Sequence, residues 1–107
     1  MSDIRELTNY LRGFVAAREW EMYHTPSNLA KSISIEAGEL LELFQWEDPS
    51  STENVEKEMA DILIYLVMMA DVMGIDLVKA TWAKIANNAA RYPVEKARGN
   101  CKKAEEL

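Results

Sequence analysis

The segment from Ile62 to Met73 most constrains the fold, because nearly all of its residues are apolar. A helix made from this segment is apolar on every side, and such a helix is buried on every side. A chain of 107 residues fits one domain. On folding, a domain of this size buries only about two-thirds of the surface that its unfolded chain exposes. We therefore expect part of this helix to face another subunit.

Signals for helix ends occur at regular places around this segment. Thr25 and Pro26 predict the start of a helix that runs to about residue 46, with Thr25 as N-cap. Ser50 with Glu53 predicts a capping box for the next helix, and Gly74 is expected to end it. These signals place two long helices on either side of a short loop.

Two further helices complete the expected architecture. One is predicted over about residues 4–22, and another begins after Asp76 as N-cap and reaches to about residue 91. No run of alternating polar and apolar residues predicts a strand. The sequence thus predicts an all-α, oligomeric four-helix bundle, formed as a single domain over residues 1–107 with a polar, frayed tail from about residue 95.

Acidic residues interrupt the apolar faces of the two central helices. On helical wheels these faces are formed by Leu29, Ile33, Leu40, Leu43 and Phe44, and by Val55, Ile62, Leu66, Met69 and Met73. Glu36 falls inside the first face with Glu39 at its edge, and Glu58 falls inside the second with Asp61 at its edge. Paired acids at this spacing are ordinary on exposed helix faces, but that reading does not explain acids inside two core faces.

Burying such carboxylates requires either protonation or a cation, because an isolated buried charge costs several kcal/mol. Magnesium suits a site made of carboxylates and keeps waters and substrate phosphates as further ligands. The only histidine, His24, has no Glu-x-x-His partner, which argues against a di-iron site. With Cys101 as the only cysteine, a zinc site of several thiolates is excluded.

Charge and hydropathy exclude other classes of partner. A net charge of −6 argues against a nucleic acid polymer, which needs a basic face. The longest apolar run, Ile62 to Ala70, is shorter than the ~20 residues of a membrane span, so no membrane partner is expected. The first residues contain no apolar signal core, and we expect a cytoplasmic protein.

The two acidic segments, Glu36–Trp46 and Glu58–Tyr65, together resemble the MazG-like all-α nucleoside triphosphate pyrophosphohydrolases. The likeness covers about residues 20–93 and is closest to the short dCTP pyrophosphatase branch. It implies hydrolysis of a (deoxy)nucleoside triphosphate, with dCTP or a related deoxynucleotide as the first candidate, to a monophosphate and pyrophosphate. It implies magnesium on four residues: Glu36, Glu39, Glu58 and Asp61. It also implies a homotetramer, built as a dimer of dimers with sites at subunit interfaces.

The resemblance also implies residues that bind substrate. Positions that the family uses near the phosphates and sugar are matched by Lys84, Asn88 and Tyr92. Two further candidates are Arg91, a cation on the same helix, and Tyr65, one turn after Asp61. Those that match the base-pocket region are Trp20, His24 and Trp46. The ordinary alternatives are a solvated helix end for the cations and core packing for the aromatic residues.

The mechanism that follows is attack of water on the α-phosphorus, with Glu36 or Glu39 taking the proton from the water. The sequence does not choose between these two, since both are also candidate metal ligands. The competing hypothesis is a non-catalytic helical interaction module or an antitoxin-like partner protein. This hypothesis explains the apolar helix that contains Ile62 to Met73, but it does not explain the acids inside two core faces. Base and sugar preference, the number of magnesium ions and the biological role stay open.

Overall fold

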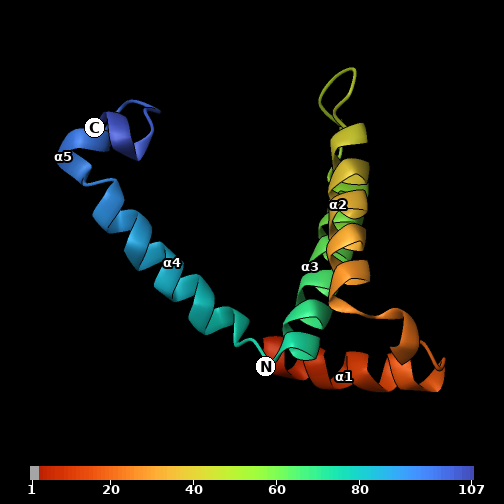
Figure 1. Cartoon of the computed structure of the whole chain (residues 1–107). Coiled ribbons are helices and arrows are strands. Elements are labelled where there is room, and N and C mark those ends of the chain that lie inside the picture. Colours follow the sequence, from red (N-terminus) through yellow and green to blue (C-terminus); the bar gives the residue numbers. More distant parts are fainter. Residues whose placement is uncertain (1–2) are drawn as a thin grey trace. The chain divides into compact units, whose positions relative to one another are not determined.

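The computed structural model describes residues 3–107 and is helical throughout (Figure 1). Its elements are α1 (Ile4–Ala17), η1 (Glu21–Tyr23), α2 (Pro26–Glu42), α3 (Glu53–Met73), α4 (Leu77–Arg91), α5 (Val94–Ala97) and η2 (Ala104–Glu106), where η denotes a 3-10 helix. No strand occurs within these residues. The prediction of an all-α fold is confirmed, and all four predicted helices are present together with the short α5.

Side chains that accept hydrogen bonds from free backbone N–H groups fix the helix starts. Asp3 accepts from the Glu6 amide at 2.9 Å, and Asp76 accepts from the Lys79 amide at 3.0 Å. Thr25 accepts from the backbone of α2 in the same way, as the sequence predicts. Gly74 ends α3 with a φ of 66°, a left-handed conformation in which a side chain would be strained.

Three helix ends differ from the sequence prediction. α1 ends at Ala17 because Glu19 adopts a φ of 54°, taking the left-handed position that glycine usually occupies. α2 ends at Glu42, and the following residues continue as tighter turns in which each amide bonds three residues back. The predicted capping box at Ser50 is wrong, because Thr52 is the N-cap of α3 and its hydroxyl bonds the Glu56 carboxylate at 3.1 Å.

The chain divides into two compact units, and the first extends to Ile75. Within it α2 and α3 run antiparallel side by side as a hairpin, and α1 packs across the end of the hairpin opposite the loop (Figure 1). The buried core consists of Val15 from α1, Leu29 from α2, and Val67 and Ala70 from α3. Leu29 and Val67 are each only 1% exposed, so they mark the centre of this core.

The second unit spans Asp76–Leu107 and contains α4, α5 and η2. Leu77 is half-buried, and the other residues of α4 are exposed. The part of the chain expected to fray contains most of α5 and all of η2, and Asn100 accepts from the Lys102 amide between them. These short turns are local structure that the polar composition does not predict.

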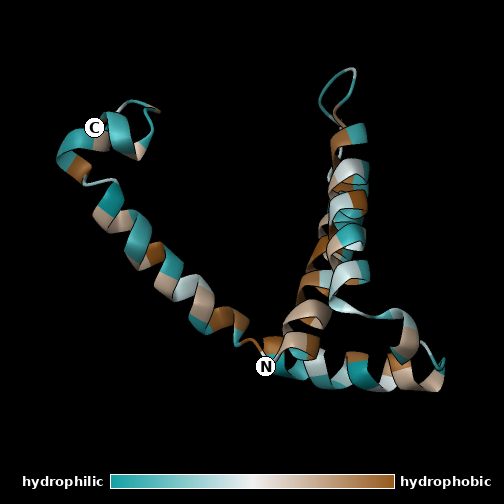
Figure 2. Ribbon diagram, viewed as in Figure 1, coloured by the Kyte–Doolittle hydropathy of each residue, from teal (hydrophilic) through white to brown (hydrophobic). Residues whose placement is uncertain are grey.

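Large apolar side chains remain exposed on the first unit. On α3 they include Met59, Leu63, Leu66 and Met73, which follow the spacing of one helical face. Apolar residues are visible along the outer side of α3 in Figure 2. Within residues 3–107, no helix is both long and apolar enough to cross a membrane.

Candidate metal centre

Three carboxylates from two helices converge on the α2–α3 hairpin. Glu36 extends from α2, and Glu58 and Asp61 extend from α3. One carboxylate oxygen from each residue can be chosen so that all three lie within 4.8 Å of one another. Because α2 and α3 pack side by side, acids placed on their facing sides meet at one point.

The cluster contains buried oxygen atoms without hydrogen-bond partners. The Oε2 atoms of Glu36 and Glu58 are both buried, and neither contacts a donor. Nearly all buried polar atoms in proteins have a partner, and each one without a partner needs an explanation. Among the described residues, no lysine or arginine forms an ion pair with these two carboxylates. These two oxygens therefore have lone pairs available to a hydrogen-bond donor or a cation.

The environment of the cluster favours the protonated forms of Glu36 and Glu58. The pKa of Glu36 rises to about 7, first because a protonated Glu36 shares a hydrogen bond with Glu39, then because of burial and the nearby negative charges. The pKa of Glu58 is also raised, mainly by burial and then by the charge of Glu39. Burial and the neighbouring negative charges contribute to both shifts.

Glu39 belongs to the cluster but has a different environment. It lies one turn after Glu36 on α2 and acts on the pKa of both Glu36 and Glu58. It is exposed, whereas Glu36, Glu58 and Asp61 are half-buried. Of the four acids predicted from the sequence, three have converging side chains, and the fourth, Glu39, lies beside them and is exposed to solvent.

A divalent cation fits this arrangement. It would occupy the point where three carboxylate oxygens converge, and it would give the two buried oxygens the partner that they lack. A donor set made only of oxygen suits magnesium, manganese or calcium rather than metals that prefer nitrogen or sulfur. The residues present therefore fit a metal site.

The predicted base-pocket residues are divided between the two ends of α2. Trp20 and His24 lie together before α2, with ring centroids 6.5 Å apart. Trp46 lies after α2 and is 88% exposed. Since α2 has 17 residues, it separates the two groups by about 25 Å within one chain. One chain does not bring Trp46 together with Trp20 and His24.

The remaining predicted substrate residues lie on α3 and in the second unit. Tyr65 is half-buried and lies one turn after Asp61 on α3. Lys84, Asn88 and Arg91 are exposed on α4, and Tyr92 follows it. The Arg91 guanidinium lies 5.7 Å from the centre of the Tyr92 ring. The roles of these residues stay predictions.

Sequence reasoning missed an ion pair between α1 and α3. Arg12 donates from Nε to Asp71 at 2.9 Å, and the two residues are separated by 59 positions along the chain. Asp71 is the single charged residue in the otherwise apolar segment from Ile62 to Met73. That isolation is a signal that the aspartate needs a partner, although it does not say which.

The sequence and the fold are similar to those of known proteins. Residues 31–107 match the MazG-like family. The whole chain is 38% identical to dCTP pyrophosphatase 1 of Rattus norvegicus and to that of Homo sapiens, and it spans 67% of each. A crystal structure of a pyrophosphatase from Archaeoglobus fulgidus superposes with a TM-score of 0.77 at 44% identity, covering 87% of this chain and 94% of that one.

Proposed function

Because the chain belongs to the MazG-like family, we propose that it is a nucleoside triphosphate pyrophosphohydrolase. It would cleave a triphosphate between the α- and β-phosphates and release a monophosphate and pyrophosphate. The observation that carries this proposal is the convergence of acids from α2 and α3 with two buried, unpartnered carboxylate oxygens. Burying carboxylates costs free energy, and a protein that only binds a partner protein gains nothing from it.

The proposed cofactor is magnesium, bound by Glu36, Glu58 and Asp61 with Glu39 beside them. When bound, magnesium would neutralise phosphate charge and orient the phosphate chain. The exposed carboxylate of Glu39 is available to a water molecule from the solvent side. We assign it as the general base, with Glu36 holding the metal.

The distribution of charge supports binding of a polyanionic substrate. Residues 1–75 contain 14 acidic and 5 basic residues, whereas residues 76–107 contain 4 acidic and 7 basic residues. Fixed cations are what a triphosphate needs besides the metal. We propose that Lys84 and Arg91 bind phosphate oxygens, and that Asn88, Tyr92 and Tyr65 contact the sugar and phosphates.

The proposed substrate is dCTP or a related deoxynucleotide, since the relatives from rat and human are dCTP pyrophosphatases. Trp20 and His24 would hold the base by stacking. Trp46 lies beyond the far end of α2 and does not join them within one chain, so it would contribute from a second copy. The proposed assembly is a homotetramer, supported by the exposed apolar side chains of α3.

A panel of triphosphates with and without magnesium tests the proposal. Pyrophosphate release should require the metal and should be fastest with dCTP among the substrates tried. Thermal unfolding should shift upward when magnesium and a non-hydrolysable triphosphate are added together. If no triphosphate is hydrolysed and no ligand shifts unfolding, the chain is an interaction module and the proposal is wrong.

A further inference from the structure

The end of α1 brings together one arginine and two aromatic rings. The guanidinium carbon of Arg18 lies 3.6 Å from the centre of the Phe14 ring and 5.9 Å from the centre of the Trp20 ring. The centres of the Phe14 and Trp20 rings are 6.0 Å apart, and their planes meet at 68°. These are the distances at which a cation attracts an aromatic ring and at which two rings pack edge to face. Phe14, Arg18 and Trp20 therefore form one aromatic cluster.

The Arg18 side chain is folded back onto its own helix. Its Nη1 donates to the Phe14 carbonyl at 3.0 Å, in the last turn of α1, where carbonyls lack a backbone partner. Although Arg18 is exposed, it forms no ion pair with a carboxylate of residues 3–107. An arginine that only placed a positive charge at the helix end would be free to extend into water. The guanidinium lies over a ring instead, and this contact uses its planar shape.

The backbone of Trp20 is held on both sides. Its amide donates to the Val15 carbonyl at 3.1 Å, and its carbonyl accepts from the Tyr23 amide at 2.9 Å. The preceding residue, Glu19, has a φ of 54°, which turns the chain away from the axis of α1. With the backbone held in this way, the direction of the indole depends on its side-chain rotation. The contacts within the aromatic cluster act on that rotation.

Trp20 keeps part of its surface open to a ligand. The residue is 42% exposed, although Phe14 and Arg18 lie beside it. The His24 ring lies 6.5 Å from the indole, and the two planes are tilted by 56°. Because of this tilt the imidazole is not stacked flat on the indole, so a planar ligand has access to the indole.

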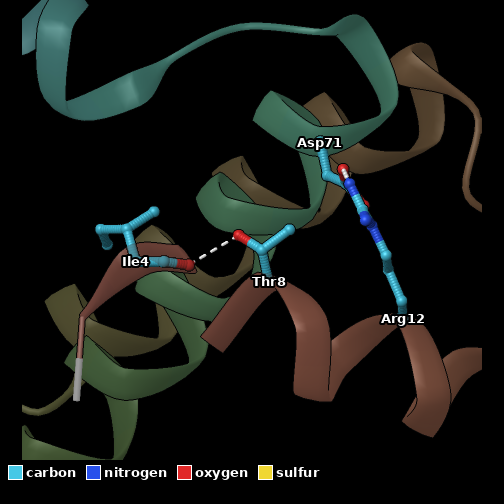
Figure 3. Close-up of polar contacts among 4 residues, drawn as sticks. All are labelled: Ile4, Thr8, Arg12 and Asp71. Atoms are coloured by element: carbon cyan, nitrogen blue, oxygen red, sulfur yellow. Dashed lines mark hydrogen bonds and ion pairs between the residues drawn. The ribbon is translucent and has the colours of Figure 1, made fainter. Parts of the chain in front are cut away.

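The helix that carries the aromatic cluster is fixed against α3. Arg12 donates from Nε to Asp71 at 2.9 Å, and Figure 3 shows its side chain extending from α1 to α3. Val15 of α1 and Val67 of α3 are both buried in the core of the same unit. Since α3 also carries two acids of the metal centre, the aromatic cluster has a set position relative to that centre.

We propose that Arg18 is a positioning residue for Trp20. Together with Phe14, it holds the indole in the orientation in which the open surface of the indole stacks on the base of the bound nucleotide. Arg18 acts through this ring and not by contact with the nucleotide. The inference rests on the proposed function, which gives Trp20 its stacking role.

Fluorine NMR of protein labelled with 5-fluorotryptophan reports on the surroundings of each indole. The chain has three tryptophans, and Trp20→Phe identifies the signal of Trp20. Arg18→Lys keeps the positive charge at the helix end but removes the planar group, so the Trp20 signal should move while that of Trp82 stays. Arg5→Lys, at an exposed arginine near the start of α1, is the matched control and should leave both signals in place. An unchanged Trp20 signal in Arg18→Lys would overturn the inference.

Kinetics test whether the orientation of the indole matters for the substrate. Arg18→Lys should raise KM for dCTP about 2- to 5-fold with little change in kcat, because Trp20 contacts the base equally in the ground and transition states. In a Trp20→Ala protein, adding Arg18→Lys should raise KM no further, because the arginine acts only through that ring. An equal further rise in the Trp20→Ala background would mean that Arg18 acts elsewhere, and the inference would be wrong.

A purely structural role of Arg18 has a different signature. Because Arg18 and Arg5 are both exposed, Arg18→Lys and Arg5→Lys should unfold at the same temperature as wild type. A lower unfolding temperature in Arg18→Lys together with a wild-type KM would mean that Arg18 only ends the helix. A wild-type protein that hydrolyses no triphosphate would instead refute the proposed function itself.

Discussion

At the scale of single residues, the four acids of the cluster differ in what surrounds them. Glu36 and Glu58 each bury an oxygen that has no partner, whereas Glu39 faces solvent. A buried carboxylate without a partner benefits from a cation, and an exposed one is free to exchange protons with water. On this difference we base the proposal that the first two bind the metal and that Glu39 takes the proton.

The metal-free protein should lose stability as the pH rises. The pKa of Glu36 is about 7 in the native state and near 4.5 when the chain is unfolded, so the native state binds more protons between these values. The free energy of unfolding therefore falls as pH increases through this window, and the raised pKa of Glu58 acts in the same direction. Melting temperatures measured in EDTA from about pH 5 to 8 should decline less steeply in Glu36→Gln. Parallel curves for variant and wild type would contradict the burial of this charge.

Substituting single acids should separate metal binding from proton transfer. Glu58→Gln should lower kcat/KM by ~100-fold or more and remove the magnesium-dependent rise in melting temperature, because a ligand is lost. Glu39→Gln should also abolish turnover but keep that rise. Glu47→Gln, on an exposed residue outside the cluster, is the control and should behave as wild type. The assignments fail if Glu39→Gln turns over normally.

At the scale of elements, the α2–α3 hairpin is the scaffold of the site. The sequence predicted both helices because Thr25, Pro26 and Gly74 are strong local signals for helix ends. It did not predict the end of α1, because Glu19 takes a left-handed conformation that usually requires glycine. The hydrogen bonds at this turn run from the Glu19 amide to the Ala16 carbonyl and from the Trp20 amide to the Val15 carbonyl, and such backbone bonds leave no residue-specific signal in the sequence.

Removing the centre of the core should destabilise the hairpin. Leu29 is 1% exposed, and Leu29→Ala leaves a cavity between α2 and its neighbours that costs roughly 2–5 kcal/mol in the free energy of unfolding. Val94→Ala on α5 is a matched control, since Val94 is exposed and its truncation should cost less than about 0.5 kcal/mol. Urea unfolding of the metal-free protein measures both. Equal effects would mean that Leu29 is not at the core of the cooperative unit.

The site was predictable only where it follows helical periodicity. Wheel positions alone placed Glu36 and Glu58 inside core faces, and both bury an oxygen in the structure. The ion pair of Arg12 with Asp71 joins residues 59 positions apart, which no local pattern relates. The separation of Trp46 from Trp20 follows already from the helix predicted between Thr25 and about residue 46, although the resemblance had grouped both residues in one base pocket.

At the scale of the whole molecule, exposed apolar surface predicts self-association. Met59, Leu63, Leu66 and Met73 form an exposed stripe on α3, and a monomer would leave it in water. Sedimentation at micromolar concentration should give a multiple of the 12.2 kDa chain mass, with a tetramer expected. Leu63→Lys should shift the protein toward smaller species, because it places a charge in the interface. A clean monomer of the wild type would refute this expectation.

The products of dCTP hydrolysis test the central claim most directly. With magnesium, in water enriched in a heavy oxygen isotope, dCMP and pyrophosphate should form one for one, without dCDP. The proposed attack of water on the α-phosphorus predicts that the label appears in dCMP and not in pyrophosphate. Release of orthophosphate with dCDP, or label found only in pyrophosphate, would contradict cleavage by attack on the α-phosphorus at the Glu36–Glu39–Glu58–Asp61 cluster.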